Sequence, residues 1–427
     1  MTKNNFIENF MLPSNLMNSS KDHIRNIDFR EITLPKNTIY IDFASSTPLD
    51  TRVFQEMIPW MLGYFANASN RSHPMGKITE YAITQARISI AKIFNVSQNE
   101  VIFTSSATES NNLLLRGLVE DPLRKRKKIV YCATEHSSII VTAKKILDHY
   151  SKVFDIEIKS IPVDMNGQII MDEAEKIIDK NTLCVCIMDV NNETGIIQTQ
   201  LQKIKVLCQK AETILHVDAA QGFARSTCIA CDVDYDTATI SSSKIYGPKG
   251  IAALIVKKRR PFIRIEAQLT GGGHEFNIRS SSLNNAAIIG FAKACSLQKK
   301  EAQMRIMHYK KMEEAFCDEI QQHILAHFFG NNTEKVPGII TLYFSGVNAS
   351  NLLEKSKIVC ASISSEYKTL QEIGSHVLDA MGVALEHSLS SFRVSFGLTN
   401  SEDEVREAAR ILAKTAIKLK RDSVILT

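Results

Sequence analysis

The fold of this chain is decided by residues 214–250, which read ILHVDAAQGFARSTCIACDVDYDTATISSSKIYGPKG. Two short apolar runs, Ile214–Val217 and Thr237–Ser241, have the length and the β-branched content of buried strands. Each run ends in polar residues, the first at Asp218 and the second at a serine cluster followed by Lys244. In open α/β sheets ligands bind at the carboxyl ends of the strands, so these polar residues mark a candidate site.

Similar runs occur on both sides of this stretch. Further candidate strands are Ile39–Asp42, Val101–Thr104, Ile129–Cys132, Cys184–Met188 and Ile251–Val256. Segments with a helical period lie between them, at Ile78–Ile93, Ser137–His149 and Gln200–Ala211. The alternation of strand and helix predicts an α/β fold with a mostly parallel sheet that is covered by helices on both faces.

The C-terminal part of the chain has a different rhythm. A long helical segment, from about Leu283 to His327, is followed by a turn-like break and then by shorter elements. These elements are strands at Gly338–Phe344, Lys357–Ser362 and Phe392–Ser395 and a last helix from about Glu402. We therefore predict an N-terminal arm (1–38), a large domain (39–285) and a small α+β domain (286–427), against which the arm and the first helix could pack.

The composition is that of a globular protein, with 427 residues, of which 44% are hydrophobic and 23% are charged. The formal net charge of +5 is too small to indicate a nucleic-acid binder, and the basic run 124–128 is expected to be a solvated helix end. No apolar run approaches the ~20 residues that span a bilayer. The nine scattered cysteines predict reduced thiols in a cytoplasmic protein, and the acidic residues of the arm argue against a transit peptide.

Four strand ends carry residues that could bind a ligand or react. They are Thr104–Ser110, Ala133–His136, Asp218–Gln221 and Ser241–Lys244. Taken singly, each has an ordinary interpretation, because hydroxyl clusters cap helices, strand-end aspartates form turns and most lysines are solvated. Together they are the parts of a pyridoxal phosphate site: hydroxyl and N–H groups for the phosphate, a carboxylate for the pyridine nitrogen and a lysine amine for the aldehyde.

An ordered series of motifs carries a resemblance to a known family. The motifs are Ile39–Pro48, Arg71–His73, Ala107–Asn112, Thr134–His136, Val190–Gly195, His216–Gln221, Lys244–Gly250 and Gly271–Glu275. With them the sequence resembles the class V aminotransferase family, and within it the cysteine desulfurases of NifS and IscS type, from about residue 39 to about residue 420. The resemblance implies the type I fold of pyridoxal phosphate enzymes, with a mainly parallel seven-stranded sheet in the large domain and a smaller α+β domain.

The resemblance also implies roles for individual residues. Lys244 would be the Schiff-base lysine, and His136 would stack on the cofactor ring and help to move protons. Asp218 would pair with the pyridine nitrogen. The other cofactor contacts would be Asn192 and Gln221 beside the phenolic oxygen and Ala107, Thr108, Ser241, Ser243 and Ser282 at the phosphate. Arg393, together with Asn192, would bind the substrate carboxylate, a task that suits the guanidinium fork.

Further partners follow from the same resemblance. A homodimer is implied, because Ser282 would complete the phosphate cup of a second subunit. The substrate would be a small amino acid, L-cysteine or an analogue, and a sulfur-acceptor protein is a further candidate partner. We expect no metal, nucleic-acid or membrane partner. The lone motif Cys228-Ile-Ala-Cys231 has no second pair at zinc spacing, so it gives little support to a metal or redox site.

The sequence departs from the family at its reactive loop. Tyr367 stands where the family has the cysteine that carries sulfur as a persulfide, and a phenol, with a pKa of about 10, cannot do so. Three possibilities remain open: Cys360 replaces that cysteine, sulfur leaves as free sulfide, or another amino acid is the substrate. Smaller departures are Ser106 at a glycine position, where a Cβ would crowd the phosphate, Ser243 at a histidine position, and Ser281 and Leu398.

These departures leave three functional hypotheses. The first is a pyridoxal phosphate enzyme of the cysteine desulfurase family that transfers or releases sulfur. The second is a transaminase or a carbon–sulfur lyase, in which Tyr367 donates a proton or lines the pocket. The third is a non-catalytic homologue that acts as a binding partner, against which the joint presence of Lys244, Asp218, His136, Gln221 and Arg393 argues.

Overall fold

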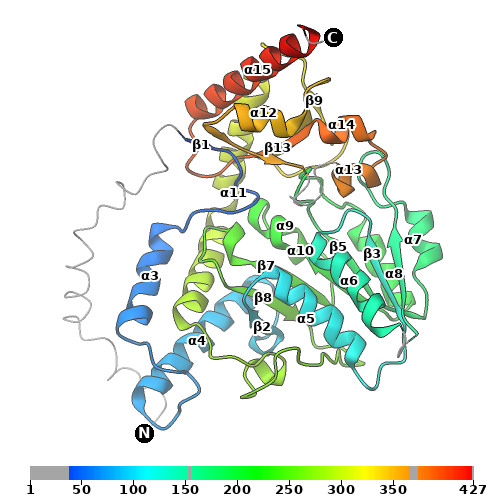
Figure 1. The fold of residues 1–427 in the computed structure, drawn as a ribbon. Helices are drawn as coiled ribbons and strands as arrows, with labels where there is room; N and C mark the ends of the chain where they lie inside the picture. Colours follow the sequence, from blue (N-terminus) through cyan, green and yellow to red (C-terminus); the bar gives the residue numbers. More distant parts are fainter. Residues whose placement is uncertain (1–37, 152–154, 365–373, 426–427) are drawn as a thin grey trace.

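The computed structural model describes residues 38–151, 155–364 and 374–425 (Figure 1). Its centre is a seven-stranded sheet in the order β2-β8-β7-β6-β5-β3-β4. The strands are β2 (Val101–Thr104), β3 (Lys128–Cys132), β4 (Glu157–Ile161), β5 (Thr182–Met188), β6 (Ile214–Asp218), β7 (Thr237–Ser241) and β8 (Ala252–Val256). Only β8 runs antiparallel to its neighbours β2 and β7. The predicted α/β fold with a mainly parallel sheet is therefore confirmed.

Two differences from the sequence prediction concern the large sheet. β4 was not predicted, because it lies at the edge of the sheet and its exposed Glu157, Lys159 and Ser160 give it a polar sequence. The strand predicted at Ile39–Asp42 is only β1 (Ile39–Tyr40), which pairs with β11 (Val359–Cys360) outside the large sheet. The segment after β1 is thereby directed from the small sheet towards the ends of the large one, which matters for the site below.

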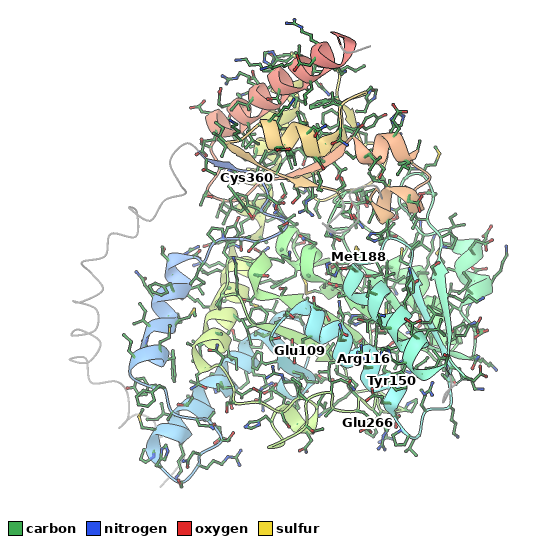
Figure 2. The ribbon with its side chains drawn as sticks, in the orientation of Figure 1. Glu109, Arg116, Tyr150, Met188, Glu266 and Cys360 are labelled. Carbon is green, nitrogen blue, oxygen red and sulfur yellow. A yellow bond between two sulfur atoms is a disulfide. The ribbon has the colours of Figure 1, made fainter. Side chains whose placement is uncertain are left out.

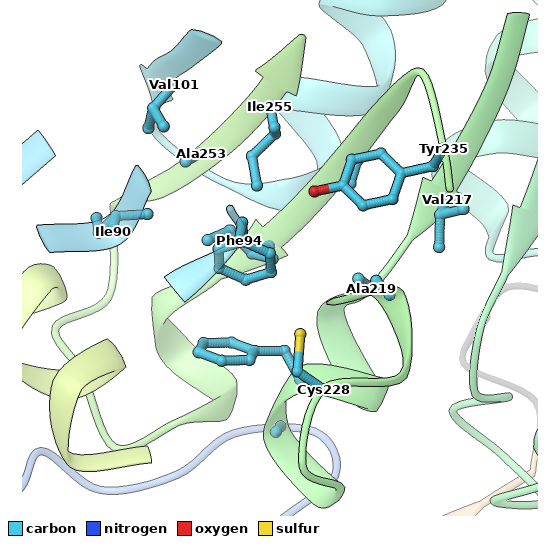
Figure 3. Packing of buried hydrophobic residues seen from close by; sticks show 14 of the residues in the cluster. Ile90, Phe94, Val101, Val217, Ala219, Cys228, Tyr235, Ala253 and Ile255 are labelled. Atoms are coloured by element: carbon cyan, nitrogen blue, oxygen red, sulfur yellow. The ribbon is translucent and has the colours of Figure 1, made fainter. Parts of the chain in front are cut away.

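Helices cover both faces of the large sheet because the buried strands are apolar on both sides. In β5, Cys184 and Cys186 belong to one apolar cluster, and Val185 and Ile187 belong to the other. Figure 3 shows part of the second cluster, which includes Phe94, Tyr235 and Val217. The helices of the first face are α5 (Ala107–Glu120) and α6 (Ser137–Tyr150), and those of the second include α4 (Pro74–Ile93), α8 (Leu201–Lys210) and α9 (Ala220–Arg225). The other helices of this part are α3 (Thr51–Leu62), α7 (Met171–Ile177) and α10 (Ile229–Asp232).

A second, smaller sheet lies beyond the large one, at the top of Figure 1. It is antiparallel, in the order β12-β13-β10-β9, with β9 (His327–Phe328), β10 (Ile339–Tyr343), β12 (Ser362–Ile363) and β13 (Ser391–Ser395). Its helices are α12 (Ala349–Lys355), α13 (His376–Ala380), α14 (Leu385–Leu389) and α15 (Glu402–Ile425). Buried residues of α15 and of this sheet share one apolar cluster, as expected for a small α+β unit.

The long helix α11 (Asn285–Gln321) belongs to both units. Its first half, with Ile288 and Phe291, packs in the core of the large sheet, and its second half, with Met312 and Phe316, packs against α15. The predicted domain boundary after residue 285 stays a prediction, and α11 would bridge the two domains that it separates. No helix in the described part of the chain combines the length and the apolar character that crossing a bilayer requires.

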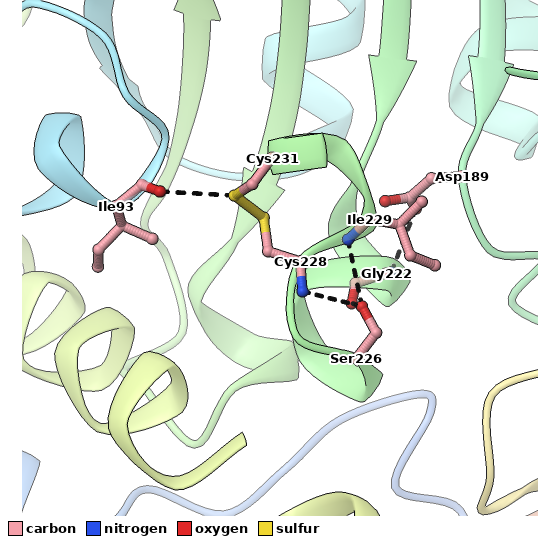
Figure 4. The surroundings of a disulfide bond; sticks show 7 residues. All are labelled: Ile93, Asp189, Gly222, Ser226, Cys228, Ile229 and Cys231. Atoms are coloured by element: carbon pink, nitrogen blue, oxygen red, sulfur yellow. Dashed lines mark hydrogen bonds between the residues drawn. A yellow bond between two sulfur atoms is a disulfide. The ribbon is translucent and has the colours of Figure 1, made fainter. Parts of the chain in front are cut away.

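Cys228 and Cys231 form a disulfide bond at the start of α10 (Figure 4). The prediction that all nine cysteines are reduced is therefore wrong for this pair. The short helical turn brings the two Cα atoms to 5.3 Å, which is within the range that a disulfide bridges. The hydroxyl of Ser226 accepts the N–H groups of Cys228 and Ile229 and donates to the carbonyl of Gly222, so the disulfide is tied to the end of α9.

Candidate active site

A cavity of about 200 Å³ opens at the carboxyl ends of the parallel strands. Asp218 ends β6, Ser241 ends β7 and Met188 ends β5, so the sheet itself brings these side chains to one place. Figure 2 shows Met188 at the end of the large sheet that faces the small unit. The cavity is lined by Ser106, Ala107, Thr108, His136, Met188, Val190, Asn192, Asp218, Ala220, Gln221, Ser241, Ser243 and Lys244.

Most of the predicted site residues therefore meet around this one cavity. Exceptions are Ser282, which is exposed on the surface of this chain, and Arg393, which lies behind Asn192. The predicted catalytic Tyr367 lies outside the described residues. The predicted residues that line the cavity come from five separate segments of the sequence. They converge because the carboxyl ends of neighbouring parallel strands lie at the same edge of the sheet.

Lys244 reaches the cavity from a single turn of 3₁₀-helix, Ser242–Lys244, that follows β7. Its ammonium group donates to the backbone carbonyls of Ala44 and Ser45, at 2.8 and 2.6 Å. The segment that contains Ala44 and Ser45 is also bound to the 3₁₀-turn by Thr47, whose hydroxyl donates to the carbonyl of Ser243. The chain after β1 thus forms a wall of the site and fixes the direction of the lysine side chain.

Asp218 is buried, and its carboxylate accepts two N–H groups. Oδ1 accepts the backbone N–H of Ala220 at 3.1 Å, and Oδ2 accepts the side-chain amide of Asn111 at 2.9 Å. Two more carboxyl groups, Glu135 and Asp189, are completely buried nearby. Burial, and next the charge of Asp218, raise the pKa of Glu135 well above its usual range and that of Asp189 to about 8. Burial therefore favours the protonated form of both carboxyl groups.

Gln221 offers an unused acceptor to the cavity. Its amide nitrogen donates to the carbonyl of Ala44 at 2.9 Å, which leaves the amide oxygen buried and without a hydrogen-bond partner among the described residues. A buried polar atom without a partner costs free energy, so it marks a place where a ligand group is expected. A hydroxyl or an amine on a ligand ring would satisfy this atom.

The opposite end of the cavity suits an anion. The first residues of α5, Ala107 and Thr108, line it, and the N-terminus of a helix favours negative charge. The hydroxyls of Ser241 and Ser243 lie 3.2 Å apart and add two donors. Ser106 has an extended backbone, and its hydroxyl caps α5 by accepting the N–H of Glu109 at 3.1 Å. It lines the cavity, and the crowding of the phosphate by its Cβ stays a prediction.

His136 stands at the N-cap of α6, beside the cavity. Its ring nitrogen Nδ1 accepts the backbone N–H of Ser138 at 3.1 Å and lies 2.8 Å from the hydroxyl of the same serine. Its own backbone N–H donates to Oε2 of Glu135. Ser138 therefore orients the imidazole, and Glu135 holds the backbone of the same residue.

Arg393 is 2% exposed and is already engaged within the chain. Its Nη2 atom contacts Asp42 and Ser45, both at 2.8 Å, and Nη1 donates to the carbonyl of Asn192 at 2.8 Å. Nε is buried and has no partner among the described residues. The guanidinium of Arg393 therefore lies next to Asn192, the other residue predicted to bind the substrate. A substrate carboxylate would have to bind this guanidinium while Asp42 also forms an ion pair with it.

Cys360 lies on β11, on the side of the small unit (Figure 2). It pairs with Tyr40, and no cysteine lines the cavity in the part of the chain that the structure describes. Burial, and next the charge of Asp42, raise the pKa of the Cys360 thiol. The thiolate is the reactive form, so this environment makes Cys360 a weak nucleophile.

Sequence reasoning missed one polar residue that joins these groups. Asn111 is completely buried on α5 and contacts Ser138, Asp218, His216 and Thr239. A signal was present, because Asn111 precedes the apolar run Leu113–Leu115, and a polar side chain on the apolar side of a helix needs buried partners. Its partners, however, come from three other segments, and the sequence does not name them.

Comparisons with known proteins place this architecture in a family. The model of the class V aminotransferases matches residues 39–407. Among curated proteins, a cysteine desulfurase IscS of Neisseria meningitidis serogroup C is 33% identical over 388 residues, which cover 90% of this chain and 94% of that protein. A probable mitochondrial cysteine desulfurase of Schizosaccharomyces pombe is 34% identical over 86% of this chain and 72% of its own.

Solved structures agree with the sequence comparison. A NifS-like protein superposes with a TM-score of 0.79 and 29% identity, over 88% of this chain and 98% of that one. A NifS-like protein from Rickettsia africae has a TM-score of 0.75 and 28% identity, over 88% and 99% of the two chains. The chain therefore belongs to the class V aminotransferase family, whose members use pyridoxal phosphate, and within it to the enzymes similar to cysteine desulfurases.

Proposed function

We propose that this protein is a pyridoxal phosphate enzyme that cleaves the carbon–sulfur bond of L-cysteine or a close analogue. The observation that carries the proposal is the convergence of Lys244, Asp218, His136 and Gln221 on one cavity that ends at the N-terminus of α5. The cysteine desulfurases among its relatives favour cysteine as the substrate.

The residues around the cavity fit the cofactor. Lys244 would attach the cofactor through its amine, and Asp218 would pair with the pyridine nitrogen. The side-chain oxygen of Gln221, which has no partner among the described residues, would accept a hydrogen bond from a substituent of the cofactor ring. The phosphate would lie between the start of α5 and the hydroxyls of Ser241 and Ser243. When bound, pyridoxal phosphate withdraws electrons from the α-carbon of an amino-acid substrate.

The side chains around the cavity would then pair with the charge on the cofactor, transfer protons and orient the substrate. Asp218 lines the cavity, whereas the raised pKa values of the buried Glu135 and Asp189 favour their neutral forms, so Asp218 would be the partner of the pyridine nitrogen. The Lys244 amine and the His136 ring border the same cavity and are the groups that can move protons within it. Arg393 and Asn192 would orient the substrate carboxylate.

Sulfur release without a protein persulfide is a second, more specific candidate. We infer from the sequence that Tyr367 occupies the place of the family cysteine. No thiol lines the described cavity, and the raised pKa of Cys360 disfavours its thiolate. Elimination would convert cysteine and water into sulfide, ammonia and pyruvate and would need no thiol on the protein. Transamination of another amino acid stays an alternative that the same cofactor residues would support.

A homodimer is also part of the proposal. Ser282 is exposed and is not among the residues lining the cavity of its own chain, which supports its role at the phosphate of a partner subunit. A cytoplasmic location and a sulfur-acceptor partner remain predictions.

The test is a product analysis with L-cysteine and the cofactor-loaded protein, with and without a thiol reductant. Sulfide with pyruvate and ammonia would support elimination, and sulfide with alanine that requires the reductant would support desulfuration. If the protein binds the cofactor but forms neither set of products from cysteine, the proposed substrate is wrong. If it also fails to bind pyridoxal phosphate, the proposed enzyme class is wrong.

A further inference from the structure

Asn111 is a buried side chain whose amide uses all of its hydrogen-bonding capacity. Nδ2 donates to Oγ of Ser138 at 2.8 Å and to Oδ2 of Asp218 at 2.9 Å. Oδ1 accepts from Thr239 Oγ1 at 2.8 Å and from Nε2 of His216 at 3.1 Å. The amide thus links the carboxylate of the site to the serine that holds His136.

The direction of these hydrogen bonds is fixed by chemistry. A carboxylate only accepts, so the nitrogen and not the oxygen of the Asn111 amide must face Asp218. The amide oxygen then faces His216, which must donate from Nε2. Burial lowers the pKa of His216 to about 4, so this ring is neutral, and its Nδ1 is left to accept from the hydroxyl of Thr237 at 3.0 Å.

The same logic reaches His136. Because Ser138 Oγ accepts a hydrogen from Asn111, its own hydrogen is available to Nδ1 of His136, 2.8 Å away. The backbone N–H of Ser138 donates to that same Nδ1. Two donors aimed at Nδ1 make it an acceptor, so the hydrogen of a neutral His136 ring resides on Nε2.

We propose that Asn111 and Ser138 are positioning residues that keep His136 in the Nε2–H tautomer and couple that tautomer to the carboxyl group of Asp218. His136 would then enter the reaction as a proton donor through Nε2. This catalytic consequence rests on the proposed function, whereas the tautomer itself does not, because every contact in the chain of hydrogen bonds belongs to the protein.

The experiment compares Ser138→Ala with Ser137→Ala, its neighbour on α6. Protein with ¹⁵N-labelled histidine is examined by NMR before and after loading with pyridoxal phosphate, and the His136 signals are identified by their loss in His136→Gln. We expect protonated Nε2 and unprotonated Nδ1 in the wild type and in Ser137→Ala. In Ser138→Ala the population of the Nδ1–H tautomer should rise roughly fivefold, the ratio that corresponds to one net hydrogen bond.

Two further variants separate the hydroxyl from mere packing. Ser138→Thr retains the hydroxyl and should restore the wild-type tautomer ratio. Asn111→Leu, which keeps the approximate shape but not the amide, should shift the ratio in the same direction as Ser138→Ala. If Asn111→Leu does not fold, the Ser138 series still decides the question.

The outcomes distinguish this inference from the proposed function. A protonated Nδ1 in the wild type, or an equal tautomer ratio in Ser138→Ala and Ser137→Ala, would overturn the inference even if the protein binds the cofactor and turns over cysteine. The expected ratios in a protein that does not bind pyridoxal phosphate would support the positioning network and reject the proposed function.

Discussion

The guanidinium of Arg393 and the carboxylate of Asp42 form an ion pair of 2.8 Å at the junction of the two units of the fold. Asp42 follows β1, which pairs with the small unit. The carbonyls of Ala44 and Ser45, shortly after it in the chain, accept hydrogen bonds from the ammonium group of Lys244. One short stretch of chain therefore orients both the proposed substrate-binding arginine and the proposed cofactor-binding lysine.

Replacement of Arg393 by lysine should raise KM for the amino-acid substrate by roughly tenfold or more. A single ammonium group cannot replace the planar fork that contacts Asp42, Ser45 and Asn192 at the same time. Steady-state kinetics measure the change, and the absorbance of the bound cofactor should stay normal. Arg264→Lys, on the exposed surface, is the matched control. An unchanged KM in Arg393→Lys would remove Arg393 from the substrate site.

Lys244→Ala should abolish the visible absorbance of lysine-bound pyridoxal phosphate and reduce turnover to background. The amine is the only group for which we propose a covalent link to the cofactor. Absorbance spectra after dialysis test this, with Lys249→Ala as the control, because Lys249 follows closely in the chain and is exposed. If Lys244→Ala retained the absorbance, another lysine would hold the cofactor.

The contribution of Asp189 to the free energy of unfolding should fall as the pH rises from about 4 to about 8. Burial, and next the charge of Asp218, raise the pKa of Asp189 to about 8 in the folded state, so between these limits the folded protein holds a proton that the unfolded chain has released. Asp189→Asn should flatten this slope. Denaturant unfolding across this pH range measures it, with the exposed Asp148→Asn as the control. An equal slope in Asp189→Asn and the wild type would contradict the buried, protonated state.

Alkylation of the denatured protein without a reductant should modify seven thiols, the free cysteines of the structure. After reduction, all nine cysteines should react, because the Cys228–Cys231 bond is then open. Intact mass spectrometry counts the adducts, and Cys228→Ser, which leaves Cys231 unpaired, should give eight without a reductant. Nine adducts on the untreated wild type would mean that this disulfide is absent in solution.

Tyr367→Cys should change the products formed from L-cysteine. A thiol at this position can take the substrate sulfur as a persulfide, so alanine should replace pyruvate as the carbon product. Amino-acid analysis and detection of protein-bound persulfide measure the change. Tyr367→Ser, which also removes the ring but adds no thiol, should form no persulfide. The same products from both variants would place the sulfur chemistry away from residue 367.

Much of the fold could be predicted from local sequence. The buried strands β2, β3, β5, β6 and β7 are short apolar runs whose pattern is visible in any window of the chain. β4 was missed because an edge strand has exposed polar residues. The disulfide was missed because a C-x-x-C motif forms one only when the local backbone brings the two Cα atoms close enough.

The site was predicted only in part, because local sequence does not show which segments pack against each other. Lys244, Asp218 and the residues at the start of α5 follow strands directly, so strand ends locate them. Asn111 lies inside α5 and carries no such mark, and the positions of Glu135 and Asp189 after β3 and β5 do not reveal that both are completely buried. Their roles depend on which groups face them from other segments and on how completely water is excluded, and both of these are properties of the packed molecule.

The sequence by itself determined the elements, the order of the chemical groups along the chain and the family to which they point, because apolar period and motif spacing are local properties. The tertiary structure alone decided that Arg393 is shared with Asp42, that Lys244 is held by the segment after β1, and that one buried amide joins Asp218 to His136. These are contacts between residues far apart in the chain, so their distances and the exclusion of water around them are set only when the chain is packed.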